Sequence, residues 1–419
     1  MTPSNYWRNP DRASPVNLAV VRVLTGLYAV WKLLSYEWLA LSTYPYVVFA
    51  ESPHAYLVSP VVLDVLPALV AVTVGLILAV VVGYRLAATG FLSAVLLAYL
   101  SGVHYAVSNQ GSTFLPVVYL LLLFALFSSE DRLSVDAIRR TAGWSTASLN
   151  RRLTTDTPET YRHSALQWTL LVVAFVYFFT GLGKILDGGA QWATAGNLSR
   201  TILTDSYMYL DGVPPVGRFI IEHEVLALGA GAGTLVLELG FVFVVVLGAP
   251  LWPAVVGLLG MHTFIAVGMH ILFFDQYLLF TLFLPWDDIY GRLWRPEPLT
   301  VLYDDDCHVC ARLLYPFELL DVDDSIEFVT PATAPERCPS EVDAPPTTAV
   351  SVFDERGDGS HGYRALRYLA VHSRVLAPLG WAMGIGPCAT LCQSAYDRAT
   401  ADRAQQADQG AENRSSEEV

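Results

Sequence analysis

The chain has 419 residues, of which 53% are hydrophobic and only 15% are charged, and its mean hydropathy is +0.43. A soluble globular protein usually carries about 25% charged residues, so the composition excludes both a single water-soluble domain and a disordered chain. The charge is also unevenly placed. Residues 301–419 hold 20 Asp and Glu against 9 Arg, whereas residues 1–300 hold 19 acids against 16 basic residues. We therefore expect lipid around the first part and water around the second.

Eight apolar windows predict membrane helices within residues 1–290. A helix that crosses the hydrocarbon core needs about 20 residues, and the fourth and eighth windows are shorter than that. The windows are Leu18–Leu34, Val61–Val82, Ala87–His104, Phe114–Phe127, Ala165–Ile185, Leu226–Leu247, Ala254–Ile271 and Tyr277–Trp286. Arginine is concentrated in the segments that would face inward, which places both termini in the cytoplasm. The pattern predicts a multi-pass α-helical bundle of about eight spans in the cell membrane, with the lipid bilayer as its partner.

One inner connection, residues 128–163, carries six arginines. We expect it to form short helices on the membrane surface, where cationic side chains meet lipid headgroups.

The aqueous part predicts a small α/β domain over residues 300–400, after a linker at 291–299. Strands are expected at Thr300–Tyr303, Ser325–Val329 and Thr348–Phe353, and helices at Cys307–Leu320 and Arg364–His372. Strands that alternate with helices are typical of α/β folds. The acidic residues 401–419 predict a disordered tail. With 20 acids, 9 arginines and no lysine, this part has the composition of a halophilic protein and no basic patch for nucleic acid.

The strongest chemical signal is a C-x-x-C motif, Cys307-His308-Val309-Cys310, placed where a strand ends and a helix begins. The positive end of the helix dipole favours the thiolate of the first cysteine. The second thiol, one turn later, can resolve a mixed disulfide. His308 would favour the thiolate when protonated, whereas Asp304 and Asp306 oppose it unless one of them transfers a proton.

Two alternatives remain open for these cysteines. Cys388 and Cys392 lie four positions apart, so together with Cys307 and Cys310 they could make a tetrahedral zinc site. The other alternative is inert packing. Cys338 has no assigned role, and no metal site is expected in the membrane part.

A family resemblance supports the redox interpretation. The string LYDDDCHVC, the later strand AVSVFD and the closing Tyr396-Asp397-Arg398 resemble the DCC family of predicted thiol-disulfide oxidoreductases, with Asp305 where that family usually has glycine. The resemblance implies a thioredoxin-like fold that needs no cofactor, with Cys307 as nucleophile and Cys310 as resolving thiol.

A second resemblance covers roughly residues 10–290. The string YFFTGLGK, which ends at Lys184 and is followed by Trp192, resembles vitamin K-dependent gamma-carboxylase and the related HTTM family. The resemblance implies that Lys184 is a base that deprotonates a quinol. Independently, a desolvated lysine can act as a base near neutral pH. The alternative is that Lys184 reaches the membrane interface as an anchor.

Ionisable residues within the spans are costly in lipid and usually face a bundle interior. Glu238 is the most central of them, and we expect it to pair with Arg22 or Lys32. His262 is expected on a cavity wall or as a core histidine whose hydrogen bonds are satisfied.

These features favour a membrane-bound thiol-disulfide oxidoreductase that acts on an unidentified thiol or disulfide and exchanges electrons with a quinone near Lys184 and Glu238. One alternative is a carboxylase-like or epoxidase-like membrane enzyme, with Lys184 as base and the dithiol domain as an accessory. The other is a non-enzymatic membrane protein with a structural zinc site.

Overall fold

The structure of the chain is a computed structural model. It describes residues 15–50, 52, 55–108, 114–131, 133–154, 164–209, 212–284, 286, 289, 297–321, 325–333, 350–373 and 376–398. The chain divides into two compact units, which we call the membrane unit (residues 1–136 and 160–287) and the dithiol unit (residues 137–159 and 288–419). Cys338, residues 291–296 of the expected linker and the expected tail at 401–419 lie outside the described residues.

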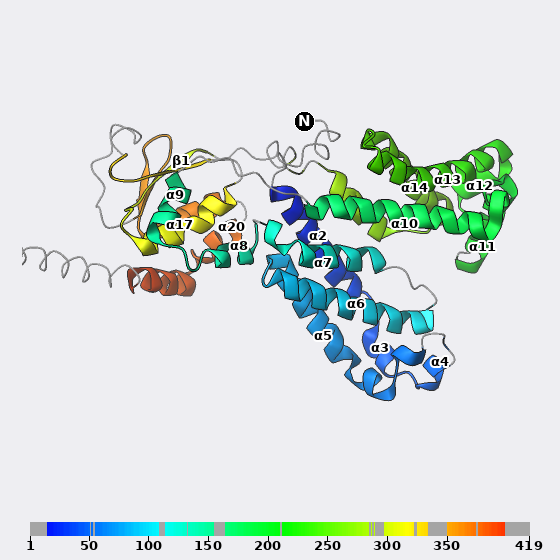
Figure 1. The fold of residues 1–419 in the computed structure, drawn as a ribbon. Helices are drawn as coiled ribbons and strands as arrows, with labels where there is room; N and C mark the ends of the chain where they lie inside the picture. The colour runs from blue at the N-terminus through cyan, green and yellow to red at the C-terminus, as the bar shows by residue number, and fades with distance from the viewer. Residues whose placement is uncertain are drawn as a thin grey trace, which may run out of the picture. The chain divides into compact units, whose positions relative to one another are not determined.

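The membrane unit is helical (Figure 1). Its long helices are α2 (Pro15–Leu34), α5 (Pro60–Val82), α6 (Leu86–Ser108), α10 (Ser164–Gly188), α13 (Glu224–Val246) and α14 (Leu251–Met269). These six helices are long and apolar enough to cross a membrane. The fourth window forms the shorter helix α7 (Leu115–Leu126), and the eighth window contains the end of α15 (Phe274–Phe280) and a 3-10 turn at Thr281–Phe283. The described part of this unit also contains the α-helices α3 (Trp38–Ser42), α4 (Val47–Ala50), α11 (Ala195–Tyr209) and α12 (Pro215–Glu222).

Helix α5 shows how the local sequence sets the ends of these helices. The Ser59 hydroxyl accepts a hydrogen bond from the Val62 amide, Pro60 takes the first helical position, and Gly83 ends the helix with a φ of 71°. That left-handed conformation favours glycine. The last carbonyls of α5 are satisfied from another helix, because the guanidinium of Arg22 donates to Val80 O and Val81 O.

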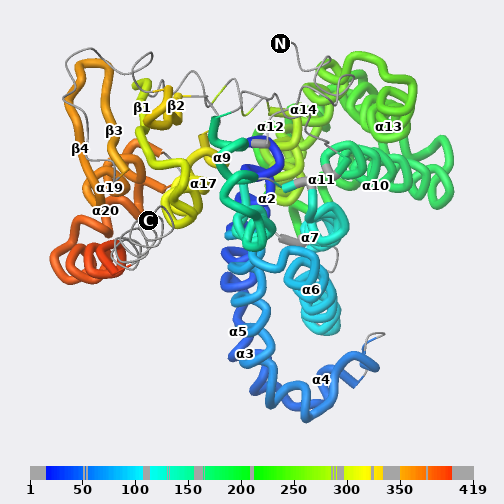
Figure 2. Tube along the Cα trace, turned by 60° about the vertical axis from the view of Figure 1, so that its left-hand side comes forward, coloured from blue at the N-terminus to red at the C-terminus, as the bar shows by residue number. Residues whose placement is uncertain are grey.

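The dithiol unit holds a four-stranded sheet in the order β2-β1-β3-β4 (Figure 2). Strands β1 (Leu299–Leu302) and β2 (Ile326–Val329) are parallel and are joined by α17 (His308–Leu320). Strand β3 (Ser351–Phe353) runs antiparallel to β1 and forms a hairpin with β4 (Gly359–His361). Helices α19 (Tyr363–His372) and α20 (Ala377–Ala382) follow. The predicted small α/β domain is confirmed, and the hairpin adds a fourth strand to the three expected.

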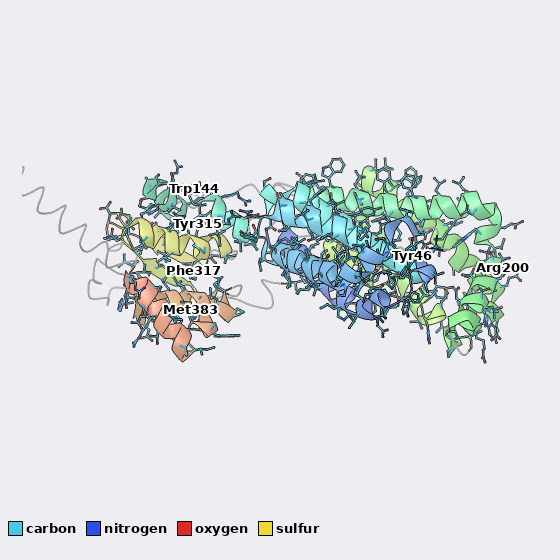
Figure 3. The ribbon with its side chains drawn as sticks, turned by 90° about the horizontal axis from the view of Figure 1, so that it is seen from below. Tyr46, Trp144, Arg200, Tyr315, Phe317 and Met383 are labelled. Carbon is cyan, nitrogen blue, oxygen red and sulfur yellow. A yellow bond between two sulfur atoms is a disulfide. The ribbon has the colours of Figure 1, made fainter. Side chains whose placement is uncertain are left out.

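The connection between α7 and α10 contains two short α-helices, α8 (Val135–Arg140) and α9 (Thr146–Thr154). Short helices were expected here, but on the membrane surface. In the structure α9 packs against α17 and β2. Leu149 and Leu153 are buried in the same hydrophobic core as both cysteines of the motif. Just before α9, the Trp144 ring meets the Tyr315 ring of α17 with centroids 5.8 Å apart (Figure 3).

Candidate functional site

Cys307 stands at the N-cap of α17, immediately before the first helical residue. Its backbone is extended, and its Sγ accepts a hydrogen bond from the Cys310 amide at 3.1 Å. A free amide at a helix N-terminus usually takes an oxygen acceptor from Ser, Thr or Asp. Here a sulfur takes that place, so the amide and the helix dipole both favour negative charge on Cys307 when the thiol is reduced.

Cys307 and Cys310 form a disulfide, with their Cα atoms 5.2 Å apart. Both residues are buried, with 2% of each exposed. The predicted C-x-x-C pair is therefore close enough for disulfide chemistry, and it lies within the packed core of the dithiol unit rather than on its surface.

The acids that precede Cys307 shape the turn between β1 and α17. The Asp304 carboxylate accepts a hydrogen bond from the Asp306 amide at 2.9 Å, and the Cys307 amide donates to the Asp304 carbonyl at 3.1 Å. Such side-chain-to-backbone turns are typical of aspartate. Asp305 and Asp306 are exposed. Asp304 thus has a role in the backbone turn, and the Asp306 carboxylate faces solvent.

Helix α9 contacts the motif on both sides of Cys307. Oγ1 of Thr146 is hydrogen-bonded to Nδ1 of His308 at 3.0 Å. The side-chain amide of Asn150 donates to the carbonyl of Asp305, and Oδ1 of Asn150 accepts from the hydroxyl of Tyr303 at 3.3 Å. Burial raises the pKa of Tyr303 above its ordinary value, and the nearby Asp305 carboxylate adds to the rise.

Thr146 and Asn150 are the site residues that the sequence reasoning missed. Leu149 and Leu153, four positions apart, indicate an apolar face on α9, but nothing in the sequence says what that face covers. The contact joins segments 162 positions apart, which local patterns do not reveal.

The cysteines offered as further zinc ligands lie elsewhere in the dithiol unit. Cys388 and Cys392 fall in a helical stretch over residues 386–398, where Cys388 is exposed and neither is in a disulfide. Within the described residues no group of three or more His, Cys, Asp or Glu side chains is placed to hold a metal ion. The four-cysteine arrangement needed for the zinc alternative is therefore not formed in this part of the chain.

In the membrane unit, Lys184 forms an ion pair with Glu238. Its ammonium also lies 4.9 Å from the centre of the Trp192 ring. Gly181 lets α10 approach α13 closely, since a Cβ there would lie 3.0 Å from the Cβ of Glu238. The string around Lys184 thus brings its amino group to a buried carboxylate.

His262, on α14, is buried. Its Nε2 is hydrogen-bonded to the Tyr177 hydroxyl at 2.9 Å, and that hydroxyl also contacts Oε1 of Gln276 at 3.1 Å. Oε2 of Glu238 and Nδ1 of His262 are buried and have no hydrogen-bond partner among the described residues. These two atoms are among the buried polar atoms of the membrane unit that could contact a bound molecule.

The expected partners of Glu238 were wrong. Arg22 pairs with Asp131 at 2.5 Å, and Lys32 pairs with Asp275 at 2.5 Å. Both lysines of the chain are thus ion-paired with acids of other helices. The reason is geometric, because Glu238 on α13 faces Lys184 on the adjoining α10.

No protein-family model, curated protein or solved structure matches this chain. The assignment of a function therefore rests on the residues and their geometry.

Proposed function

We propose that the chain is a membrane-bound thiol-disulfide oxidoreductase in which Cys307 and Cys310 cycle between a disulfide and two thiols. The observation that carries the proposal is the position of Cys307 at the N-cap of α17, bonded to Cys310 and accepting the Cys310 amide. A C-x-x-C that follows the first strand of a βαβ unit is typical of thioredoxin-like redox sites. The strand order β2-β1-β3-β4 supports the same fold.

The chemistry follows from the two thiols. The Cys307 thiolate attacks one sulfur of a substrate disulfide, forming a mixed disulfide and releasing the first substrate thiol. The Cys310 thiolate then attacks Sγ of Cys307, which closes the protein disulfide and releases the second substrate thiol. The substrate gains two electrons and two protons, and the protein loses them. The reverse sequence oxidises a substrate dithiol.

We extend the proposal to the membrane unit. We propose that it is an HTTM-like bundle of about eight spans joined to a DCC-type domain, and that both termini lie in the cytoplasm. Six long apolar helices support a membrane-spanning bundle. Helix α7 has 12 residues and α15 has 7, which is fewer than the about 20 residues of a helix that crosses the hydrocarbon core by itself. The dithiol unit then lies in the cytoplasm. Cysteine thiols are kept reduced there, and the disulfides that form are usually transient and take part in redox chemistry.

A quinone is the proposed electron partner within the membrane unit. Quinone oxygens accept hydrogen bonds and quinol hydroxyls donate them, so the unpartnered Oε2 of Glu238 and Nδ1 of His262 fit such a molecule. Aromatic rings lie beside His262, since the Tyr177 ring is 5.9 Å from the His262 ring and 5.9 Å from the Phe241 ring. When bound, a quinone would exchange two electrons and two protons with the dithiol.

A second candidate is a membrane enzyme in which Lys184 acts as base and the dithiol unit is accessory. The observation that favours it is the contact of Lys184 with buried Glu238, because an anchor at the interface would reach water instead. Lys184→Arg keeps the positive charge but removes the base. Under this second function Lys184→Arg abolishes activity, whereas under the dithiol function it leaves thiol exchange intact.

The proposal is tested by trapping the mixed disulfide. Full-length Cys310→Ser, incubated with excess glutathione disulfide, should hold glutathione on Cys307, as located by peptide mass spectrometry. Cys307→Ser should not hold glutathione on Cys310 to a comparable extent. A Cys310→Ser chain whose Cys307 stays unmodified would contradict the role of Cys307 as nucleophile.

A further inference from the structure

Helix α9 packs beside the dithiol, although it comes from a part of the chain that precedes the α/β domain. It belongs to the connection between α7 and α10, and it is separated from Cys307 by more than 150 residues. The apolar face of α9 enters the dithiol core through Leu149 and Leu153, which are 0% and 6% exposed. The core around Cys307 and Cys310 therefore includes side chains from this distant segment.

The polar contacts of α9 lie on the two sides of Cys307. Asn150 holds the carbonyl of Asp305, two residues before Cys307, and Thr146 holds the ring of His308, one residue after it. Thr146 and Asn150 are four positions apart, so they lie on the same face of α9. That face spans the start of α17, where the sulfur of Cys307 sits.

Thiol-disulfide exchange requires a sulfur atom of the substrate to reach a sulfur of the protein disulfide. Cys307 is 2% exposed and Cys310 is 2% exposed, so neither is open to an incoming sulfur in this arrangement. A part of the surroundings has to move before exchange can occur. Helix α9 is joined to both sides of Cys307 by side-chain hydrogen bonds.

We propose that α9 is a movable cover of the dithiol, held closed by Thr146 and Asn150, and that exchange occurs when α9 withdraws. This inference rests on the proposed dithiol function and adds a control of access to it. Opening breaks the hydrogen bonds of Thr146 and Asn150 and exposes Leu149 and Leu153, whereas the pairing of strands β1 to β4 does not involve α9. When it opens, a substrate thiolate attacks Sγ of Cys307, the bond to Cys310 breaks, and Cys310 leaves as a thiolate.

The test measures how fast dithiothreitol reduces the disulfide in the full-length protein. Dithiothreitol loses two hydrogens and becomes a cyclic disulfide, and Cys307 and Cys310 gain them. The extent of reduction is read as a mass shift after alkylation. The double variant Thr146→Val with Asn150→Ala should be reduced about five- to thirtyfold faster than the unaltered chain. Thr154→Val, an exposed threonine on the same helix, serves as the matched control and should react at the unaltered rate.

Thr146→Ser separates the hydrogen bond from general damage to the helix. Serine keeps the hydroxyl that contacts His308, so Thr146→Ser should react at the unaltered rate while Thr146→Val reacts faster. The proposal is overturned if the double variant reacts at the unaltered rate, or if Thr146→Ser is as fast as Thr146→Val. Equal rates in all variants would overturn the cover and leave the dithiol function standing. A pair never found as a disulfide would overturn both.

Discussion

Thr146 and His308 are 162 positions apart in the chain, and their side chains are hydrogen-bonded at 3.0 Å. One residue lies in the connection between two helices of the membrane unit, and the other lies between the two cysteines. The dithiol site is thus assembled from two parts of the chain that are separated in the sequence by residues 160–287 of the membrane unit. This arrangement underlies the first prediction.

Leu149→Ala should destabilise the dithiol unit by roughly 2–5 kcal/mol, because it removes a fully buried side chain from the core around Cys307 and Cys310. Leu313→Ala on α17 is the matched control, since Leu313 is 36% exposed and its loss should cost far less. Pulse proteolysis of the full-length protein across a urea series, read by cleavage within residues 300–400, measures both changes. Equal effects would show that α9 is not docked in this core.

Asp304→Ala should lower the stability of the turn that leads to Cys307 by roughly 1 kcal/mol, because it removes the acceptor of the Asp306 amide. Asp304→Asn keeps a side-chain oxygen and should retain most of the stability. Asp306→Ala, an exposed acid in the same turn, should change little. The same proteolysis series measures all three variants. A loss for Asp306→Ala as large as that for Asp304→Ala would contradict the turn's dependence on Asp304.

The stability of the dithiol unit should fall as the pH rises above about 10, the ordinary pKa of tyrosine. Burial raises the pKa of Tyr303 in the folded state, with Asp305 adding to the rise. The folded chain therefore holds this proton more tightly than the unfolded chain. The contribution is fully present below the unfolded pKa and is lost as the pH rises through the folded one.

Tyr303→Phe carries no such proton, so its urea midpoint should fall less than that of the unaltered chain between about pH 9 and pH 11. Its stability at neutral pH should be slightly lower, because the hydrogen bond to Asn150 is lost. If the urea midpoints of the two proteins fall by the same amount between these pH values, Tyr303 does not contribute to the pH dependence of stability.

Lys184→Met should lower the stability of the membrane unit by roughly 3–5 kcal/mol, because it leaves the buried carboxylate of Glu238 unpaired. Glu238→Leu should cost less, because the Lys184 side chain is 22% exposed. The double variant should lose less than the sum of the two, since no buried charge remains. Thermal unfolding of the detergent-solubilised chain measures the set, with Glu224→Leu as an exposed control on α13. Strict additivity would contradict the ion pair.

The same double variant tests the proposed coupling to quinone. In native membranes, added quinol should shift Cys307 and Cys310 toward the reduced state in the unaltered chain. The shift should be lost when Lys184 and Glu238 are replaced. An equal shift in both would separate the dithiol from the membrane unit.

Much of the dithiol unit could be predicted because its signals are local. The alternation of strands and helices placed β1, α17, β2 and α19 within one or two residues of their observed bounds. The C-x-x-C spacing indicated the disulfide, since two cysteines one helical turn apart at a helix start are close in any such fold.

The partners of the buried charges could not be predicted in the same way. Glu238 had several cations available to it, and only the packing of α10 on α13 selects Lys184. The docking of α9 could not be predicted for a related reason. Its arginines indicated lipid headgroups, and nothing in the sequence indicated that Leu149 and Leu153 pack in the core of the dithiol unit. Both outcomes depend on contacts between distant segments, which periodicity and composition do not encode.

The central claim is that Cys307 and Cys310 are a working redox pair. Its most direct test is alkylation trapping of both thiols in native membranes, before and after a pulse of dithiothreitol and again after reoxidation. The account predicts that the two cysteines are modified together in the reduced sample and protected together in the oxidised ones. A pair whose state stays the same through the whole cycle would contradict it.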